Sequence, residues 1–443
     1  MRAPATGRWA TSVRRVGLTG RDGSDPPSGA GRPPGSAVPF NLVLVLGALS
    51  ALGPLANDTY LPALPSLTRD LHSSTAAAQL TLTTCFVGLA LGQLLVGPLS
   101  DRKGRRVSLL AGVATFTAAS AACAVVSDVW VLVALRLVEG GAAAAAIVVV
   151  RTVVRDLTSG AAAARLFSLL MLVNGLVPIL APLAGGQLLH VTDWRGIFGA
   201  LAAAGALLWC IGVVALRETH PPELRRTSRG LAATLLTYGR LLADRRFLGY
   251  TLTQGLSMGA MFAYIAGSPF VLQNVFHLSP QLFSVAFASN AFGILAASQV
   301  SGHLVRRVHP ARIFTAGALS CAAGGTGLLA AAVAHAGVFA LLVPLFVTVA
   351  SMGLILPNGA ALALQDHPQE SGSASALVGS AQFLIGAAVA PLVGIAGPRT
   401  ALPMAVVICV LGAGSATAVL LTRTTERLRV APAALPETAT PPP

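Results

Sequence analysis

Apolar segments of about 20 residues recur along most of this 443-residue chain, and they limit what it can fold into. An α-helix of that length is long enough to cross the ~30 Å hydrocarbon core of a bilayer. Only 10% of the residues are charged, against about 25% in a typical soluble domain, so a large soluble core could not be covered. The sequence therefore predicts an all-α integral membrane protein. We place twelve transmembrane helices at residues 39–62, 76–98, 107–126, 129–150, 165–189, 196–216, 247–272, 281–304, 311–333, 337–360, 372–396 and 400–422.

A polar segment near the middle of the chain divides these helices into six and six. The chain before the first helix is rich in Pro, Gly, Ser and Arg and has no apolar periodicity, which is typical of a disordered tail. We therefore predict five parts. They are an N-terminal cytoplasmic tail at residues 1–37, a six-helix bundle at 38–216, a cytoplasmic central loop at 217–246, a second six-helix bundle at 247–422 and a C-terminal cytoplasmic tail at 423–443.

The basic residues are distributed unevenly between the two sides of the predicted membrane protein. If both termini lie in the cytoplasm, 26 of the 30 lysines and arginines fall on the cytoplasmic side. Three (Arg69, Arg195 and Arg399) fall on the outer side, and one (Arg136) lies within a helix. Cytoplasmic loops of membrane proteins carry such an excess of positive charge. The net charge of +14 thus indicates a multi-pass protein of the cytoplasmic (inner) membrane, and not a nucleic-acid-binding protein.

The stretch Gly97-Pro-Leu-Ser-Asp101-Arg102-Lys-Gly104-Arg105-Arg106 holds one acid and four bases between two apolar segments. Charges of this density are too costly in hydrocarbon, so the stretch must form a short aqueous turn. Asp101 can cap a helix or pair with an arginine, and the two glycines permit close approach and a tight turn. A faint copy lies 205 residues later, from Gly302 to Gly317, with an arginine in place of the aspartate. A duplicated six-helix unit is typical of secondary transporters.

The turn resembles the signature between helices 2 and 3 of the major facilitator superfamily. The segment Asp58-Thr-Tyr60-Leu-Pro-Ala-Leu-Pro resembles a signature of the bicyclomycin-resistance branch of its twelve-helix drug/proton antiporters. Residues 136–141, 150–157, 264–273 and 371–377 match the same branch, so the resemblance covers residues 40–422. It implies two pseudo-symmetric six-helix bundles, the major facilitator fold. In the family the turn helps latch the cytoplasmic faces together, which assigns a cytoplasmic gate to Gly97, Asp101, Arg102, Gly104 and Arg105.

The fifth helix resembles the Gly-Pro-x-x-x-Gly-Gly element of antiporter-type facilitators. It reads Pro178-Ile-Leu-Ala181-Pro182-Leu-Ala-Gly185-Gly186, with alanine at position 181 where the family often has glycine. Proline bends a helix, and small residues let a neighbouring helix approach closely. Uptake carriers of the superfamily usually lack this element, so the resemblance favours export.

Three ionisable residues within predicted helices are candidates for proton coupling: Asp58, Arg136 and Glu139. Arg136 and Glu139 are three residues apart, so they lie on one helix face and can pair. The family usually has Gln or another neutral residue where this chain has Glu139. Either carboxylate can carry the proton. The alternative is structural, with Asp58 a solvated acid near a helix end and Arg136–Glu139 a static ion pair.

Polar side chains within the helices are candidates for binding substrate, although each can instead form a structural hydrogen bond between helices. They are Tyr60, Asn174, Gln254, Tyr264, Asn290 and Gln382. The five cysteines all lie in apolar segments without metal-ligand spacing, so no metal site is expected.

These features predict a proton-coupled exporter of small amphipathic drugs, similar to bicyclomycin- and chloramphenicol-resistance carriers. Such a protein needs no cofactor beyond the proton gradient, and we expect a monomer in membrane lipid. An uptake symporter with the same fold is the alternative. An integral-membrane transferase is a remote one, because the histidines are scattered and the loops between the helices carry no Asp-x-x-Asp pair. A primary pump is disfavoured by the absence of a phosphate-binding Gly-x-x-x-x-Gly-Lys-[Ser/Thr] loop.

Overall fold

The computed structural model describes residues 40–158, 160–219, 231–367, 370–394 and 399–430, and all regular secondary structure within them is helical. Eleven of the described helical segments are long and apolar enough to cross a membrane. The predicted helix 165–189 corresponds to α7 (Gly160–Leu188), whose fully described apolar part is Leu172–Leu188. The predicted all-α membrane fold and the order of its helices are therefore confirmed.

The first transmembrane segment is broken, where the sequence predicted one continuous helix at 39–62. It consists of α1 (Phe40–Ser50), α2 (Leu52–Asp58), the 3₁₀ helix η1 (Leu61–Ala63) and α3 (Leu64–Asp70). Proline removes one helical N–H and clashes with the carbonyl four residues earlier. Pro54 thus accounts for the end of α1 at Ser50, and Pro62 for the end of α2 at Asp58. The break leaves Asp58 at a helix terminus inside the span.

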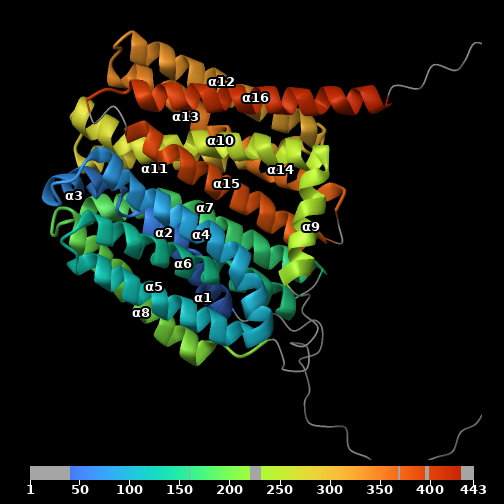
Figure 1. Cartoon of the computed structure of the whole chain (residues 1–443), viewed down its shortest axis with the longest axis horizontal. Helices are drawn as coiled ribbons and strands as arrows, with labels where there is room; N and C mark the ends of the chain where they lie inside the picture. Colours follow the sequence, from blue (N-terminus) through green and yellow to red (C-terminus); the bar gives the residue numbers. More distant parts are fainter. Residues whose placement is uncertain (1–39, 159, 220–230, 368–369, 395–398, 431–443) are drawn as a thin grey trace, which may run out of the picture. The chain divides into compact units, whose positions relative to one another are not determined.

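The remaining helices of the N-terminal half pack around one central pair. They are α4 (Thr75–Lys103), α5 (Arg105–Val125), α6 (Val129–Leu157), α7 and α8 (Trp194–Ala215). Helix α4 runs along α6, and α5 packs against both α6 and α8, as their neighbouring ribbons in Figure 1 show. The helix ends near Lys103 and Arg105 are called the basic end below, and those near Asp70 the opposite end.

The C-terminal half repeats this arrangement with longer irregular segments. It contains α10 (Arg245–Phe270), the π-helix η3 (Val271–Val275), α11 (Pro280–Leu304), α12 (Pro310–Val333), α13 (Val338–Ala350), α14 (Met352–Gln365), α15 (Ser371–Gly394) and α16 (Leu402–Val430). Helices α13 and α14 together form one candidate span. Helix α10 packs against α15 and α16, and α16 also packs against α12.

The predicted central loop 217–246 contains a helix that the sequence reading did not anticipate, α9 (Leu231–Ala243). It contacts α10 and α15 and lies across the ends of neighbouring helices in Figure 1. Helix α16 continues past the predicted end of its span to Val430. The predicted tail at residues 1–37 and the chain beyond Val430 lie outside the described residues, and the five-part division stays a prediction.

Two seams join the halves. Helix α4 packs against α15, and α7 packs against α11. In the first seam the ring of Phe86 lies 4.1 Å from that of Phe262 and 6.1 Å from that of Phe383, centroid to centroid. Near the opposite end, Gln79 of α4 donates from Nε2 to the Ala266 carbonyl at 3.0 Å. The halves thus meet through direct polar and aromatic contacts.

Candidate proton and substrate site

Arg136 and Glu139 form an ion pair on α6 that is sealed from solvent. Nη1 of Arg136 lies 2.5 Å from Oε2 of Glu139, and both side chains are 0% exposed. Ser120 of α5 donates from Oγ to the other carboxylate oxygen at 2.6 Å. A buried charge is tolerated when it is paired and its remaining oxygens are hydrogen-bonded, and both conditions hold for Glu139.

The same arginine holds the broken first segment against α6. Its Nη2 donates to Oδ1 of Asn57 at 3.0 Å, and its guanidinium lies 4.6 Å from the Tyr60 ring centroid. On its other side the Phe198 ring of α8 lies at 5.6 Å. Contacts of a cation with aromatic faces are favourable, more so away from water. Arg136 therefore connects the first segment, α6 and α8.

Asp58 follows Asn57 in sequence but does not join the Arg136–Glu139 pair. Among the described residues its carboxylate forms no ion pair and no side-chain hydrogen bond. It is 8% exposed, whereas Arg136 and Glu139 are 0% exposed, so all three residues are buried and Asp58 is the least buried of them. The carboxylate lies close enough to Tyr264 of α10 to interact with it electrostatically. The three residues predicted for proton coupling thus divide into a closed pair and a separate acid facing the other half.

Two of the predicted substrate-binding residues lie together beside this acid. Nδ2 of Asn290 on α11 donates to the Tyr264 hydroxyl at 2.9 Å. The Phe287 ring stacks on Tyr264, with centroids 5.2 Å apart and planes 18° apart. The result is one aromatic and polar surface of the C-terminal half next to a carboxylate of the N-terminal half. Such a surface can bind an amphipathic molecule between the halves.

The other predicted binding residues lie elsewhere. Nε2 of Gln382 donates to Oε1 of the fully buried Gln254 at 3.3 Å, within the C-terminal half. Asn174 donates to Oγ of Ser50 at 3.1 Å and to the Leu170 carbonyl at 2.8 Å. These bonds agree with the structural alternative, in which the side chains link helices. Tyr60 shares a hydrogen bond of 2.9 Å with Thr81 and contributes its ring to the Arg136 contact.

The glycine pair of α7 explains how Asp58 is positioned. A Cβ on Gly185 would overlap the Thr59 carbonyl, so only glycine lets α7 approach the residue after Asp58 this closely. At the next position, Gln281 of α11 donates from Nε2 to the Gly186 carbonyl at 3.0 Å. The antiporter-like segment, with Pro178 and Pro182 inside its helix, thus packs against both the acid-bearing segment and the other half.

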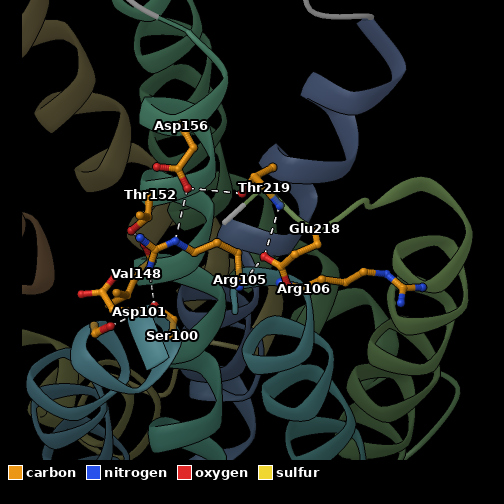
Figure 2. Close-up of polar contacts among 10 residues, drawn as sticks. Ser100, Asp101, Arg105, Arg106, Val148, Thr152, Asp156, Glu218 and Thr219 are labelled. Carbon is orange, nitrogen blue, oxygen red and sulfur yellow. Dashed lines mark hydrogen bonds and ion pairs between the residues drawn. The ribbon is translucent and has the colours of Figure 1, made fainter. Parts of the chain in front are cut away.

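A second polar cluster, the Arg105 cluster, lies at the basic end and is drawn in Figure 2. Arg105 donates from Nη1 to Asp101 and to Oγ of Ser100 at 2.7 Å, and from Nε to Oδ2 of Asp156 on α6 at 3.2 Å. Gly104 makes the tight turn between α4 and α5 at φ 98°. The predicted pairing of Asp101 with an arginine is therefore present.

Of the remaining predicted gate residues, Arg102 takes no part in these contacts, and Gly97 takes part only through its carbonyl, which accepts from Oγ of Ser100 at 3.0 Å. Arg102 is exposed, and a Cβ on Gly97 would meet no atom within 4 Å, so close packing does not explain that glycine here. The partners of the Arg105 side chain among the described residues all belong to the N-terminal half. The latch between the halves stays a prediction.

Glu218, which was not among the residues predicted from the sequence, caps the N-terminal end of α5. Its carboxylate accepts from the backbone N–H groups of Arg105 at 2.8 Å and Arg106 at 3.3 Å. In the second copy of the turn, His309 caps α12 through its own ring, accepting from the Ala311 N–H at 3.2 Å. The two turns thus differ in how the helix that follows is capped. An acid at the start of a polar loop was the only signal for Glu218.

Comparison with known proteins agrees with this geometry. Residues 46–391 match the family model described as Major Facilitator Superfamily. This chain belongs to the major facilitator superfamily. It is 38% identical over 371 residues to an MFS-type transporter of Bacillus subtilis, YdgK, covering 83% of this chain and 92% of that protein.

Two further similarities concern the branch of the family and the fold. The chain is 30% identical to the bicyclomycin resistance protein homolog of Haemophilus influenzae, covering 82% of this chain and 92% of that protein. Its fold is similar to a partially occluded inward-open structure of the xylose transporter XylE from E. coli, with TM-score 0.66 and 16% identity, covering 87% of this chain and 97% of that one. The predicted membership of a drug-resistance branch is confirmed by the first of these likenesses, and the fold by the second.

The buried pair of this facilitator predicts a strongly non-additive double-mutant cycle. Glu139→Leu leaves the Arg136 charge buried without its partner, and breaking such a pair costs about 3–5 kcal/mol. Arg136→Met combined with Glu139→Leu removes both charges and should recover most of that loss. Unfolding of the purified variants in mixed micelles measures the four free energies. A double variant as unstable as the sum of the single variants would show that the pair does not act as a unit.

The α7 contact predicts a position-specific effect of one methyl group. Gly185→Ala forces α7 away from Thr59, and overpacking of this kind costs about 1–3 kcal/mol. Gly175→Ala on the same helix is the matched control, because its Cβ would meet only the Leu295 side chain at 3.4 Å. Thermal unfolding in detergent should show a lower melting temperature for Gly185→Ala alone. Equal melting temperatures for the two variants would contradict the proposed role of Gly185.

Proposed function

We propose that this facilitator is a proton-coupled exporter of small amphipathic drugs across the cytoplasmic membrane, and that Asp58 carries the coupled proton. One observation supports the assignment most directly. Asp58 is a buried acid at a helix break inside the membrane, without an ion pair among the described residues and within electrostatic reach of Tyr264 in the other half. Discontinuous helices near the midplane form the binding sites of many secondary transporters. The similarity to a bicyclomycin resistance homolog supports a drug as the substrate.

In the proposed cycle, proton and drug compete for one region between the halves. An ionised Asp58 attracts a drug carrying a cation or a hydrogen-bond donor, and the Tyr264 and Phe287 rings cover the drug's apolar face. A proton from outside neutralises the carboxylate and releases the drug. The membrane potential contributes about 2.3 kcal/mol per charge per 100 mV to the proton's inward movement. Exchange of the two ligands shifts the population between two states of the carrier, as differential binding requires.

Glu139 has a different role in this proposal. It is ion-paired with Arg136, both its oxygens are hydrogen-bonded, and its side chain is 0% exposed. The pair keeps Arg136 in position, and Arg136 in turn holds Asn57 beside the acid. Of the two acids that the sequence left open as proton carriers, the geometry favours Asp58.

The proposal also includes the orientation of the protein in the membrane. With both termini in the cytoplasm, the Arg105 cluster faces the cytoplasm and the opposite end, with Asp70 and Trp194, faces outward. The distribution of basic residues supports this placement. We further propose that the carrier works as a monomer and uses no cofactor, because the proton gradient supplies its energy.

Transport into inside-out membrane vesicles tests the function. Acidifying the lumen creates the gradient that drives an exporter to accumulate bicyclomycin inside the vesicle. We expect vesicles with the wild-type chain to accumulate the drug. Vesicles with Asp58→Asn should accumulate no more than vesicles that lack the protein, since asparagine cannot exchange a proton. Asp128→Asn is the matched control, because Asp128 is an exposed helix cap near the same end and asparagine is also a good cap.

Three outcomes would overturn parts of this proposal. Full gradient-driven accumulation by Asp58→Asn would remove Asp58 as the proton carrier. Full accumulation by the double variant Asp58→Asn/Glu139→Gln would exclude coupling through either acid. Wild-type transport of solute along with protons, out of the acidic lumen, would identify an uptake symporter instead.

A further inference from the structure

A pocket opens at the opposite end of the protein, away from the Arg105 cluster and from Asp58. Its volume is about 460 Å³, and it lies between the end of the first segment and the C-terminal half. The residues that line it are Pro65, Thr68, Arg69, Thr75, Phe270, Asn274, Val275 and Arg399. It is large enough for a phosphate or a small organic headgroup, and neither proton coupling nor the Tyr264 surface uses it.

The charged residues that line this pocket are both basic. Arg69 and Arg399 both line it, and none of its described lining residues is acidic. Neither arginine forms an ion pair with any residue in the part of the chain that the structure describes. Asp70, the acid next to Arg69 in sequence, already accepts a hydrogen bond from Nε1 of Trp194 at 3.1 Å. Two cations that share one pocket repel each other unless an anion lies between them.

The two arginines are also a large share of the positive charge at this end. Only three of the chain's 30 lysines and arginines fall on the side assigned as outer, and the third is Arg195. Arg195 stacks on Trp194 with its guanidinium 4.3 Å from the ring and donates to the Val126 carbonyl, so its role is structural. The other two meet at one pocket although they are 330 positions apart in the sequence.

The walls of the pocket come from both halves and from irregular backbone. Thr68 and Arg69 belong to α3, which follows the proline-induced break, whereas Asn274 and Val275 belong to the π-helix η3. Single-turn π segments are frequently found at functional sites. Close by, Gln273 of η3 donates to the Pro62 carbonyl at 3.1 Å, so the backbones around the pocket are joined across the seam.

We propose that this pocket binds a phosphate-bearing anion, held by Arg69 from the N-terminal half and Arg399 from the C-terminal half. Guanidinium groups match phosphate oxygens geometrically, and Asn274 supplies a further amide donor. The anion is either free phosphate or the headgroup of an anionic phospholipid. Since its two arginines belong to different halves, a bound anion ties the halves together at this end and stabilises the form in which the seam is closed. Binding does not depend on the direction of transport, and only the label "outer" rests on the proposed function.

Binding of defined anions to the purified full-length protein tests the proposal. In the first arm, inorganic phosphate is titrated into lipid-free protein in a phosphate-free detergent buffer and followed by calorimetry and thermal unfolding. In the second arm, native mass spectrometry compares retention of phosphatidylglycerol with that of phosphatidylcholine. The variants are Arg69→Gln and Arg399→Gln, and Arg195→Gln is the control for loss of one positive charge at the same end.

We expect saturable binding of one anion that raises the melting temperature. Each of the two pocket variants should weaken it about tenfold or more, as loss of a charged hydrogen bond does, whereas Arg195→Gln leaves it unchanged. Tight phosphate binding in the first arm identifies a free anion, and selective retention of phosphatidylglycerol identifies a headgroup. The proposal is overturned if neither probe binds saturably, if both pocket variants bind as the wild type does, or if only one of the two arginines matters. None of these outcomes bears on Asp58, whose transport test stands separately.

Discussion

The buried pairing of Arg136 with Glu139 is the interaction on which the N-terminal half depends. An arginine within a transmembrane helix is costly, by about 3 kcal/mol or more at the bilayer centre, unless it is paired. Here Nη1 pairs with Glu139, Nη2 donates to Asn57, and the guanidinium lies against the Tyr60 and Phe198 rings, while Nε has no hydrogen-bond partner among the described residues. One side chain thereby fixes how the first segment and α8 lie against α6. The carboxylate of Glu139 supplies the opposite charge that a buried arginine requires in a site without water.

In our account, the Arg136–Glu139 pair stabilises the fold, and a different acid, Asp58, exchanges the proton. Two carboxylates lie in the same half, but Glu139 is buried and paired, while Asp58 lies at a helix terminus and forms no ion pair among the described residues. Pro62 creates that terminus, and Gly185 of α7 packs against the residue that follows it. In the proposed function, a change in the charge of this acid alters how the halves bind each other and a substrate. The proposed coupling therefore depends on the charge of Asp58, while the Arg136–Glu139 pair holds the surrounding helices in place.

Much of the fold could be predicted because hydropathy in a membrane protein reports helix length and order directly. The i, i+3 spacing likewise predicted the contact of Arg136 with Glu139. The partners Ser120, Asn57 and Phe198 could not be predicted, because they depend on how α5, α8 and the first segment pack. Helix α9 was not predicted because its 13 residues are too few to span a membrane. The break at Asp58 was not predicted because the first helix was placed from the length of its apolar segment alone. The meeting of Arg69 with Arg399 needs both halves in place, which no local pattern records.

The central claim is that Asp58, and not Glu139, exchanges the coupled proton. Proton release on substrate binding tests it most directly, with bicyclomycin added to purified protein in weakly buffered detergent solution containing a pH-indicator dye. Our account predicts that the wild type and Glu139→Gln release protons when the drug binds. It predicts that Asp58→Asn releases no protons on addition of the drug, whether or not the drug binds. Proton release by Asp58→Asn equal to that of the wild type, or its loss in Glu139→Gln alone, would contradict the account.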